Sequence, residues 1–129
     1  PRIQEFSVHQ EIEIVLPAPF MRPLEPCEMG SIYEMCTHIY PSGTMPEVLR
    51  LWGETIERRE EYSPMAACWS SGIGTLNRLI QVWPYRTFAE REKVQQAVQQ
   101  DGVWPSRIME LLVRKDNKLL RPAAFSPLR

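Results

Sequence analysis

The chain has 129 residues and a formal net charge of -1, because 15 Lys and Arg oppose 16 Asp and Glu. A chain of this length fits one domain with one hydrophobic core. With 43% hydrophobic and 24% charged residues, it is neither disordered nor collagen-like, and we expect a globular domain. No basic stripe is present to neutralise phosphates, so nucleic acid is not expected as a partner.

The cysteines and the hydropathy pattern indicate in which cellular compartment the protein is expected and whether it spans a membrane. Cys27, Cys36 and Cys68 are odd in number and show no CxxC spacing, which favours reduced thiols over a disulfide framework. No apolar run approaches the roughly 18 residues that a membrane span needs. The N-terminal residues also lack the apolar segment of a signal peptide. We therefore expect a cytoplasmic protein without a membrane span.

Residues 1–28 are expected to form an arm that precedes the main domain at residues 29–129. Ile12, Ile14 and Leu16 alternate with glutamates, which is typical of a half-buried strand. A proline-rich stretch follows the strand pattern and prevents the strand from continuing. The sequence predicts an extra strand-like element outside the main domain.

The proline-rich segments near the two ends of the chain share a pattern. The letters PAPF at 17–20 return as PAAF at 122–125. We expect each segment to dock along a sheet edge or on a partner, with Phe20 and Phe125 as apolar anchors.

Residues 29–129 show alternating strand and helix patterns. The expected strands are 31–40, 65–71, 76–85 and the brief 118–120, and the expected helices are 45–62, 87–101 and 106–113. Thr44 with Glu47, and Thr87 with Glu90, have the spacing of capping boxes at helix starts. The order βαββαβ predicts an α+β, ferredoxin-like fold.

Many short motifs occur at consistent spacing between residues 31 and 125. They are Tyr33-Glu34, Thr37, Pro41, Gly43, Trp69, Gly74, Leu76-Asn77, Trp83, Tyr85 and Ala89-Glu90-Arg91. In these motifs the chain resembles the NIPSNAP family. The resemblance implies a dimeric α+β barrel, in which two sheets pair face to face across a twofold axis. It also implies little about activity, since eukaryotic members are linked to mitochondria and vesicle traffic and bacterial members mostly lack an assigned activity.

Four positions depart from the family pattern. The family usually reads YELRTY in the first strand, so Cys36 stands where Arg is common and His38 where Tyr is common. Gly72 replaces a frequent Glu, and Gln81 replaces a frequent His. The Cys36 and Gln81 replacements remove a cation and a proton-shuttling group, which disfavours catalysis.

Strand alternation places Ile32, Glu34, Cys36, His38 and Tyr40 on one side of the first main strand. Gln81 and Trp83 have the matching phase in the third. We expect these sets to line the sheet face that turns away from the helices and toward a partner subunit. The candidate ligand pocket is therefore formed by Glu34, His38, Tyr40, Gln81 and Trp83.

Each candidate also has a structural interpretation, which we favour. Glu34 is expected to form an ion pair with Arg78 or with an arginine of a partner subunit. His38 has only Cys36 as a neighbouring metal-ligand type, so no metal is expected. Cys36 and Cys68 are expected to be inert and buried. The segment at 72–74 predicts a turn and not a phosphate loop, so no cofactor is expected.

Two functions from different classes follow. The first is a homodimeric binding or interaction module without catalysis, which takes a small apolar ligand or a protein partner. The alternative is a cofactor-independent monooxygenase-like enzyme that acts on a small apolar molecule in the barrel lumen. A packed lumen favours the module, whereas an open apolar pocket containing His38 favours the enzyme.

Overall fold

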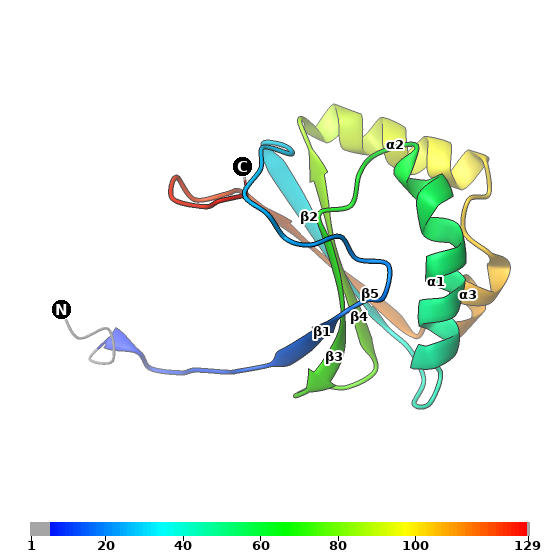
Figure 1. Ribbon diagram of the computed structural model, residues 1–129, viewed down its shortest axis with the longest axis horizontal. Helices are drawn as coiled ribbons and strands as arrows, with labels where there is room; N and C mark the ends of the chain where they lie inside the picture. Colours follow the sequence, from blue (N-terminus) through cyan, green and yellow to red (C-terminus); the bar gives the residue numbers. More distant parts are fainter. Residues whose placement is uncertain (1–5, 129) are drawn as a thin grey trace.

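A five-stranded antiparallel sheet forms the centre of the computed structural model, which describes residues 6–128 (Figure 1). The strands are β1 (Ile14–Pro17), β2 (Ile32–Ile39), β3 (Ala67–Ile73), β4 (Arg78–Tyr85) and β5 (Arg114–Leu120). Their order in the sheet is β1-β3-β4-β2-β5. The last four strands have the ferredoxin-like order, which confirms the predicted α+β fold class.

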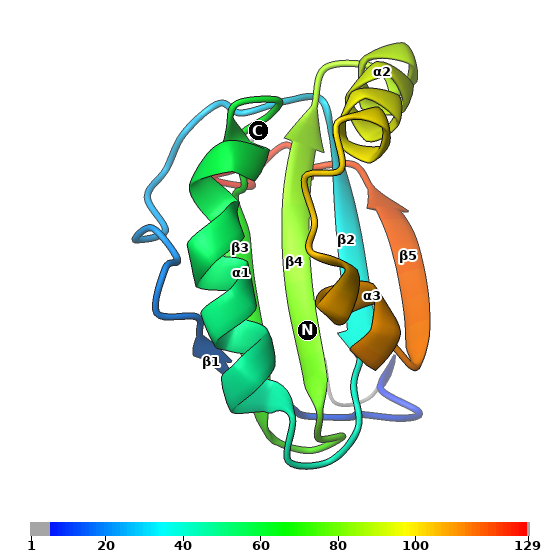
Figure 2. The same ribbon diagram turned by 90° about the vertical axis from the view of Figure 1, so that its right-hand side faces the viewer.

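Three helices cover one face of the sheet (Figure 2). They are α1 (Met45–Glu60), α2 (Phe88–Gln100) and α3 (Ser106–Leu111). The predicted cap of α2 is confirmed, because Glu90 N donates to Thr87 Oγ1 at 3.1 Å. The predicted capping box of α1 is wrong. Thr44 Oγ1 instead donates to the Pro41 carbonyl at 2.7 Å within the preceding turn.

The N-terminal arm contributes β1, which pairs with the outer edge of β3. After β1, Ala18 N donates to the Cys68 carbonyl at 2.9 Å. The Phe20 ring then stacks on Trp52 of α1, with centroids 6.5 Å apart. Phe125, the expected C-terminal anchor, is 92% exposed and does not dock on the described part of its own chain. The two proline-rich segments therefore differ in what they contact.

The assignment of sheet faces from the sequence is wrong. Ile32, Cys36 and Tyr40 are buried in the core together with α1 residues, and Glu34 bonds to α2. The side chains of this set thus point toward the helices. Alternation separates two sets of side chains in a strand, but it does not say which set the helices cover.

No helix of residues 6–128 lies on the opposite face of the sheet, and we call it the open face (Figure 1). Strand pairing places on it the residues Tyr33, Met35, Thr37, Ile39, Trp69, Ile80 and Val82. Residues 6–13 and the segment after β5 extend to this side of the sheet. Its centre is apolar, while charged residues of β5 such as Asp116 and Lys118 lie at its edge.

The glycine segment at 72–74 ends β3 and enters a tight turn, as predicted. Gly74 has φ +110°, and a Cβ there would lie 3.1 Å from Glu13 Cγ. The next element is β4 and not a helix, so the geometry of a phosphate loop is not present. Within residues 6–128, no helix combines the length and apolar character that a membrane span requires.

Candidate functional site

Two adjoining cavities lie between the helices and the sheet, and together we call them the helix-side crevice. The outer cavity measures about 600 Å³ and is lined by His38, Trp52, Glu92, Gln95, Gln96, Val98, Gln99, Gly102, Val103, Trp104, Ile108, Met109, Leu112 and Lys115. The inner cavity measures about 50 Å³ and is lined by Cys36, His38, Trp52, Arg59, Gln81, Trp83, Gln95, Val98, Trp104 and Lys115. The outer volume is in the range of small-molecule sites.

His38 lies in the wall of both cavities and is neutral at physiological pH. Burial, reinforced by the charge of Lys115, lowers the pKa of His38 to about 4. Its Nδ1 lies 3.4 Å from the hydroxyl of Tyr40. Its Nε2 is buried and has no hydrogen-bond partner within residues 6–128. The ring thus offers one unused polar atom at the crevice.

Glu34 is fully buried and belongs to a hydrogen-bonded cluster behind the crevice. Arg91 Nη2 donates to its Oε1 at 2.5 Å, Gln95 Nε2 donates to Oε2 at 3.3 Å, and Asn117 donates to Oε1. Burial alone would raise the pKa of Glu34, but the hydrogen bonds from Arg91 and Asn117 and the charges of Arg91 and Lys115 together hold the pKa below its usual value. The expected ion pair exists, but its partner is Arg91.

The partner that we expected for Glu34 makes a different contact. Arg78 forms an ion pair with Glu13 of the N-terminal arm. Strand register explains this outcome, because Arg78 lies opposite Ile39 on the open face, whereas Glu34 points toward the helices.

Arg59 is a buried cation at the inner cavity, with only 3% of its surface exposed. Its guanidinium carbon lies 4.0 Å from the centroid of the Trp83 ring. Nη1 donates to Ser63 Oγ at 3.0 Å, and Nη2 donates to the Tyr85 hydroxyl at 3.5 Å. No carboxylate of the described residues lies within ion-pair distance of it. Neutral groups and a ring face therefore surround this charge.

The structure brings together part of the predicted site. His38, Gln81 and Trp83 line the inner cavity, whereas Glu34 and Tyr40 line neither cavity and lie behind the wall. The sequence reasoning missed Trp104, Arg59 and Lys115. Lys115 faces His38 across the β2–β5 pairing. Only knowledge of that register could have identified Lys115 from the sequence.

Cys36 and Cys68 are buried, as expected. Burial raises the pKa of both the Cys36 and the Cys68 thiol to about 12. Both thiols therefore stay protonated near neutral pH, which disfavours nucleophilic chemistry. No group of three or more metal-ligand side chains gathers within residues 6–128.

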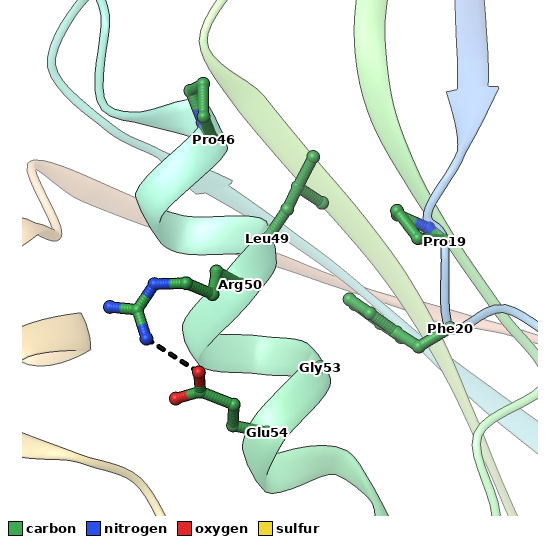
Figure 3. A pocket seen from close by; sticks show the side chains of 7 residues that line it. All are labelled: Pro19, Phe20, Pro46, Leu49, Arg50, Gly53 and Glu54. Atoms are coloured by element: carbon green, nitrogen blue, oxygen red, sulfur yellow. Dashed lines mark hydrogen bonds and ion pairs between the residues drawn. The ribbon is translucent and has the colours of Figure 1, made fainter.

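A second, shallower hollow of about 570 Å³ lies where the N-terminal arm crosses α1 (Figure 3). Its walls include Pro19, Phe20 and Leu49, and Arg50 donates to Glu54 at 2.7 Å along its rim. The arm packs closely on α1 here, since a Cβ at Gly53 would lie 3.4 Å from the Phe20 ring, at ordinary contact distance. None of its lining residues has a buried polar atom without a partner in the described chain. We therefore interpret it as the place where the arm packs on α1 and not as a ligand site.

Comparison with known proteins gives the family. The NIPSNAP family model matches residues 33–127, most of the chain. The chain belongs to the NIPSNAP family. Protein NipSnap homolog 1 of Danio rerio is 24% identical over 120 residues, which are 91% of this chain and 43% of that protein. Protein NipSnap homolog 3B of Mus musculus is 28% identical over 81 residues, or 62% of this chain and 33% of that protein. The NIPSNAP chain thus spans less than half the length of these curated relatives.

Solved structures support the same family and fold. A protein from Agrobacterium tumefaciens is 26% identical, has a TM-score of 0.72, and covers 76% of this chain and 99% of its own. A NIPSNAP domain protein from Burkholderia xenovorans is 28% identical, with a TM-score of 0.69 and 74% and 98% coverage. A NIPSNAP family protein from Agrobacterium tumefaciens is described as having unknown function. These neighbours carry no catalytic assignment.

Proposed function

We propose that this NIPSNAP chain is a homodimeric binding module without catalysis of its own, in which residues 29–129 form the main domain and residues 1–28 the arm. The observation that carries the proposal is the open face. It presents Trp69, Ile80 and Val82 beside Met35 on a sheet whose other face the helices already cover. An apolar sheet face of this kind needs a covering layer, and a second copy offers a matching one.

The arms and a structural neighbour support this assembly. Residues 6–13 and the segment after β5 extend past the open face, where they would reach the second copy (Figure 1). A ferredoxin-like protein from an uncultured marine organism, 11% identical with a TM-score of 0.54, is described as dimeric. Three free thiols favour a reducing compartment such as the cytoplasm.

The chemistry of the helix-side crevice favours binding over catalysis. The Glu34 carboxylate is engaged by Arg91 and Asn117, so it is not available as a base. Among the five pocket candidates, His38 keeps a buried polar atom that has no partner within residues 6–128. With a pKa of about 4, it is a weak base for proton transfer near neutral pH.

Native mass spectrometry of the purified chain tests the proposal, because it reports the assembly and any retained small molecule together. We expect a dimer, with more than about 1,000 Å² of surface buried between the copies. A monomer at micromolar concentration would contradict the proposed assembly. Turnover of an apolar substrate that disappears in His38→Ala, with the fold intact, would favour the monooxygenase-like alternative.

A further inference from the structure

The outer cavity of the helix-side crevice has an apolar, aromatic wall beside polar residues that include Glu92, Gln96 and Lys115. The rings of Trp52 and Trp104 lie with centroids 4.3 Å apart and line both cavities. Val98, Val103 and Ile108 add aliphatic walls to the outer cavity. Aromatic and aliphatic walls of this kind bind a flat apolar body by burying its surface.

The inner end of the crevice is different, because its charged groups are cations. Arg59 and Lys115 line the inner cavity, and none of the described residues that line it is acidic. Neither cation has a carboxylate within ion-pair distance in residues 6–128. Arg59 also keeps donor capacity, since its recorded bonds use only Nη1 and Nη2. A buried cation without a counter-charge is costly, and an anion at this position would relieve that cost.

His38 adds a neutral donor between the two parts. The Tyr40 side chain is 2% exposed, and its hydroxyl has His38 Nδ1 as its hydrogen-bond partner at 3.4 Å. In the tautomer in which the Tyr40 hydroxyl donates to Nδ1, the ring hydrogen is on Nε2. That Nε2 has no acceptor within the described chain. An acceptor oxygen of a ligand would complete the network.

From these observations we propose that the helix-side crevice binds a small organic acid with a flat apolar body. The body lies against Trp52 and Trp104 in the outer cavity. The carboxylate lies at the inner end, where His38 Nε2 donates to it and the charges of Arg59 and Lys115 balance it. This inference rests on the crevice being a binding site, as proposed above, and adds the chemical class of its ligand.

Binding of 2-naphthoate and of 2-naphthamide to the purified full chain tests the proposal. The two probes share size and shape, but only the first carries a charge. Calorimetry and tryptophan fluorescence should give a dissociation constant about tenfold lower for 2-naphthoate than for 2-naphthamide. The reason is that hydrogen bonds to a charged group are stronger than those to a neutral one.

The strand β5 offers a matched pair of variants. Lys115 faces the crevice opposite His38, whereas Lys118 lies opposite Met35 on the open face. Both lysines are exposed, so both variants should fold. We expect Lys115→Gln to weaken the binding of 2-naphthoate about three- to fivefold and to leave the binding of 2-naphthamide unchanged. The effect is modest because the charge of an exposed lysine is partly screened. Lys118→Gln should change neither.

A second pair tests the neutral donor. We expect His38→Phe, which keeps an aromatic ring, to weaken the binding of 2-naphthoate about fivefold. His9→Phe, in the exposed arm, should leave that binding unchanged. Equal affinity for the two probes, equal effects of the two lysine variants, or no binding of either probe up to about 1 mM would overturn the proposal.

The test of the ligand class can fail or succeed independently of the proposed dimer. A dimer that retains a neutral molecule and ignores 2-naphthoate overturns the acid assignment and keeps the binding module. A monomer that prefers 2-naphthoate as described supports the ligand class, although the proposed dimer fails.

Discussion

The two faces of the sheet differ in where their ionisable side chains lie. The face under the helices carries ionisable side chains, among them Glu34 and His38, and Arg59 lies above it. The open face carries Trp69, Ile80 and Val82 at its centre. Ionisable side chains are thus buried within the chain on the covered face, whereas the open face has apolar side chains at its centre and charged ones at its edge.

This difference separates folding from assembly. A buried carboxylate must find its donors within the chain that folds around it, and Glu34 finds them on α2 and β5. An apolar face needs only a complementary surface, which a second copy supplies. Variants of the covered face should therefore change stability first, whereas variants of the open face should change association.

The largest expected effect concerns Glu34. We expect Glu34→Gln to lower the free energy of unfolding by about 3 kcal/mol, because Arg91 and Asn117 lose the carboxylate that they share. Urea denaturation measures the loss. The control is Glu54→Gln, which breaks an exposed ion pair with Arg50 and should cost about 0.5 kcal/mol or less. Equal losses in the two variants would show that the buried cluster adds no more to the free energy of unfolding than an exposed ion pair does.

The open face gives the next effect, on association. Val82 pairs with Met35 and Ala67 near the centre of that face, so Val82→Lys places a charge in the proposed interface. We expect the dimer dissociation constant to rise about 100-fold, measured by analytical ultracentrifugation. Val113→Lys, at an exposed valine outside the open face, should leave association unchanged. A dimer that tolerates Val82→Lys would place its interface elsewhere.

The comparison also shows what the sequence could predict. The order of elements, the cap at Thr87 and the strand at the N-terminal arm follow from local patterns, and local patterns are visible in one sequence. The alternation in 31–40 correctly groups Glu34, Cys36 and His38 on one side. It does not identify the covered side, since that depends on where α1 and α2 pack.

The candidate site was predicted only in part, for a related reason. His38, Gln81 and Trp83 come from neighbouring strands with matching phase, which the sequence shows. Lys115 and Trp104 reach the crevice through the β2–β5 pairing and the path between α2 and α3. Those contacts join residues far apart in the chain, and no local pattern carries them.

A smaller effect on the covered face depends on pH. The pKa of His38 is about 4 in the folded protein, below the ordinary histidine value of 6.5, so the unfolded chain binds a proton more readily between these values. The contribution of His38 to the free energy of unfolding is therefore fully present above pH 6.5 and is lost as the pH falls toward 4. Lys115 strengthens this effect, and Glu34 opposes it.

Between pH 7 and pH 5, His38 should account for about 2 kcal/mol of lost stability. Urea denaturation at both pH values measures it, and His38→Phe should remove most of this slope. His9→Phe, at an exposed histidine, serves as the control and should keep the slope. A slope that persists in His38→Phe would assign the acid sensitivity to other groups.

The smallest effect concerns the start of α2, the helix that brings Arg91 and Gln95 to Glu34. Thr87 Oγ1 accepts a hydrogen bond from Glu90 N, whereas Thr44 makes no side-chain cap at α1. We expect Thr87→Ala to cost about 1 kcal/mol in the free energy of unfolding and Thr44→Ala to cost less, because only the first leaves a helix N–H without its acceptor. If the loss in Thr87→Ala adds to that in Glu34→Gln in the double variant, the cap and the buried cluster are independent. A combined loss smaller than the sum would show that the position of α2 couples them.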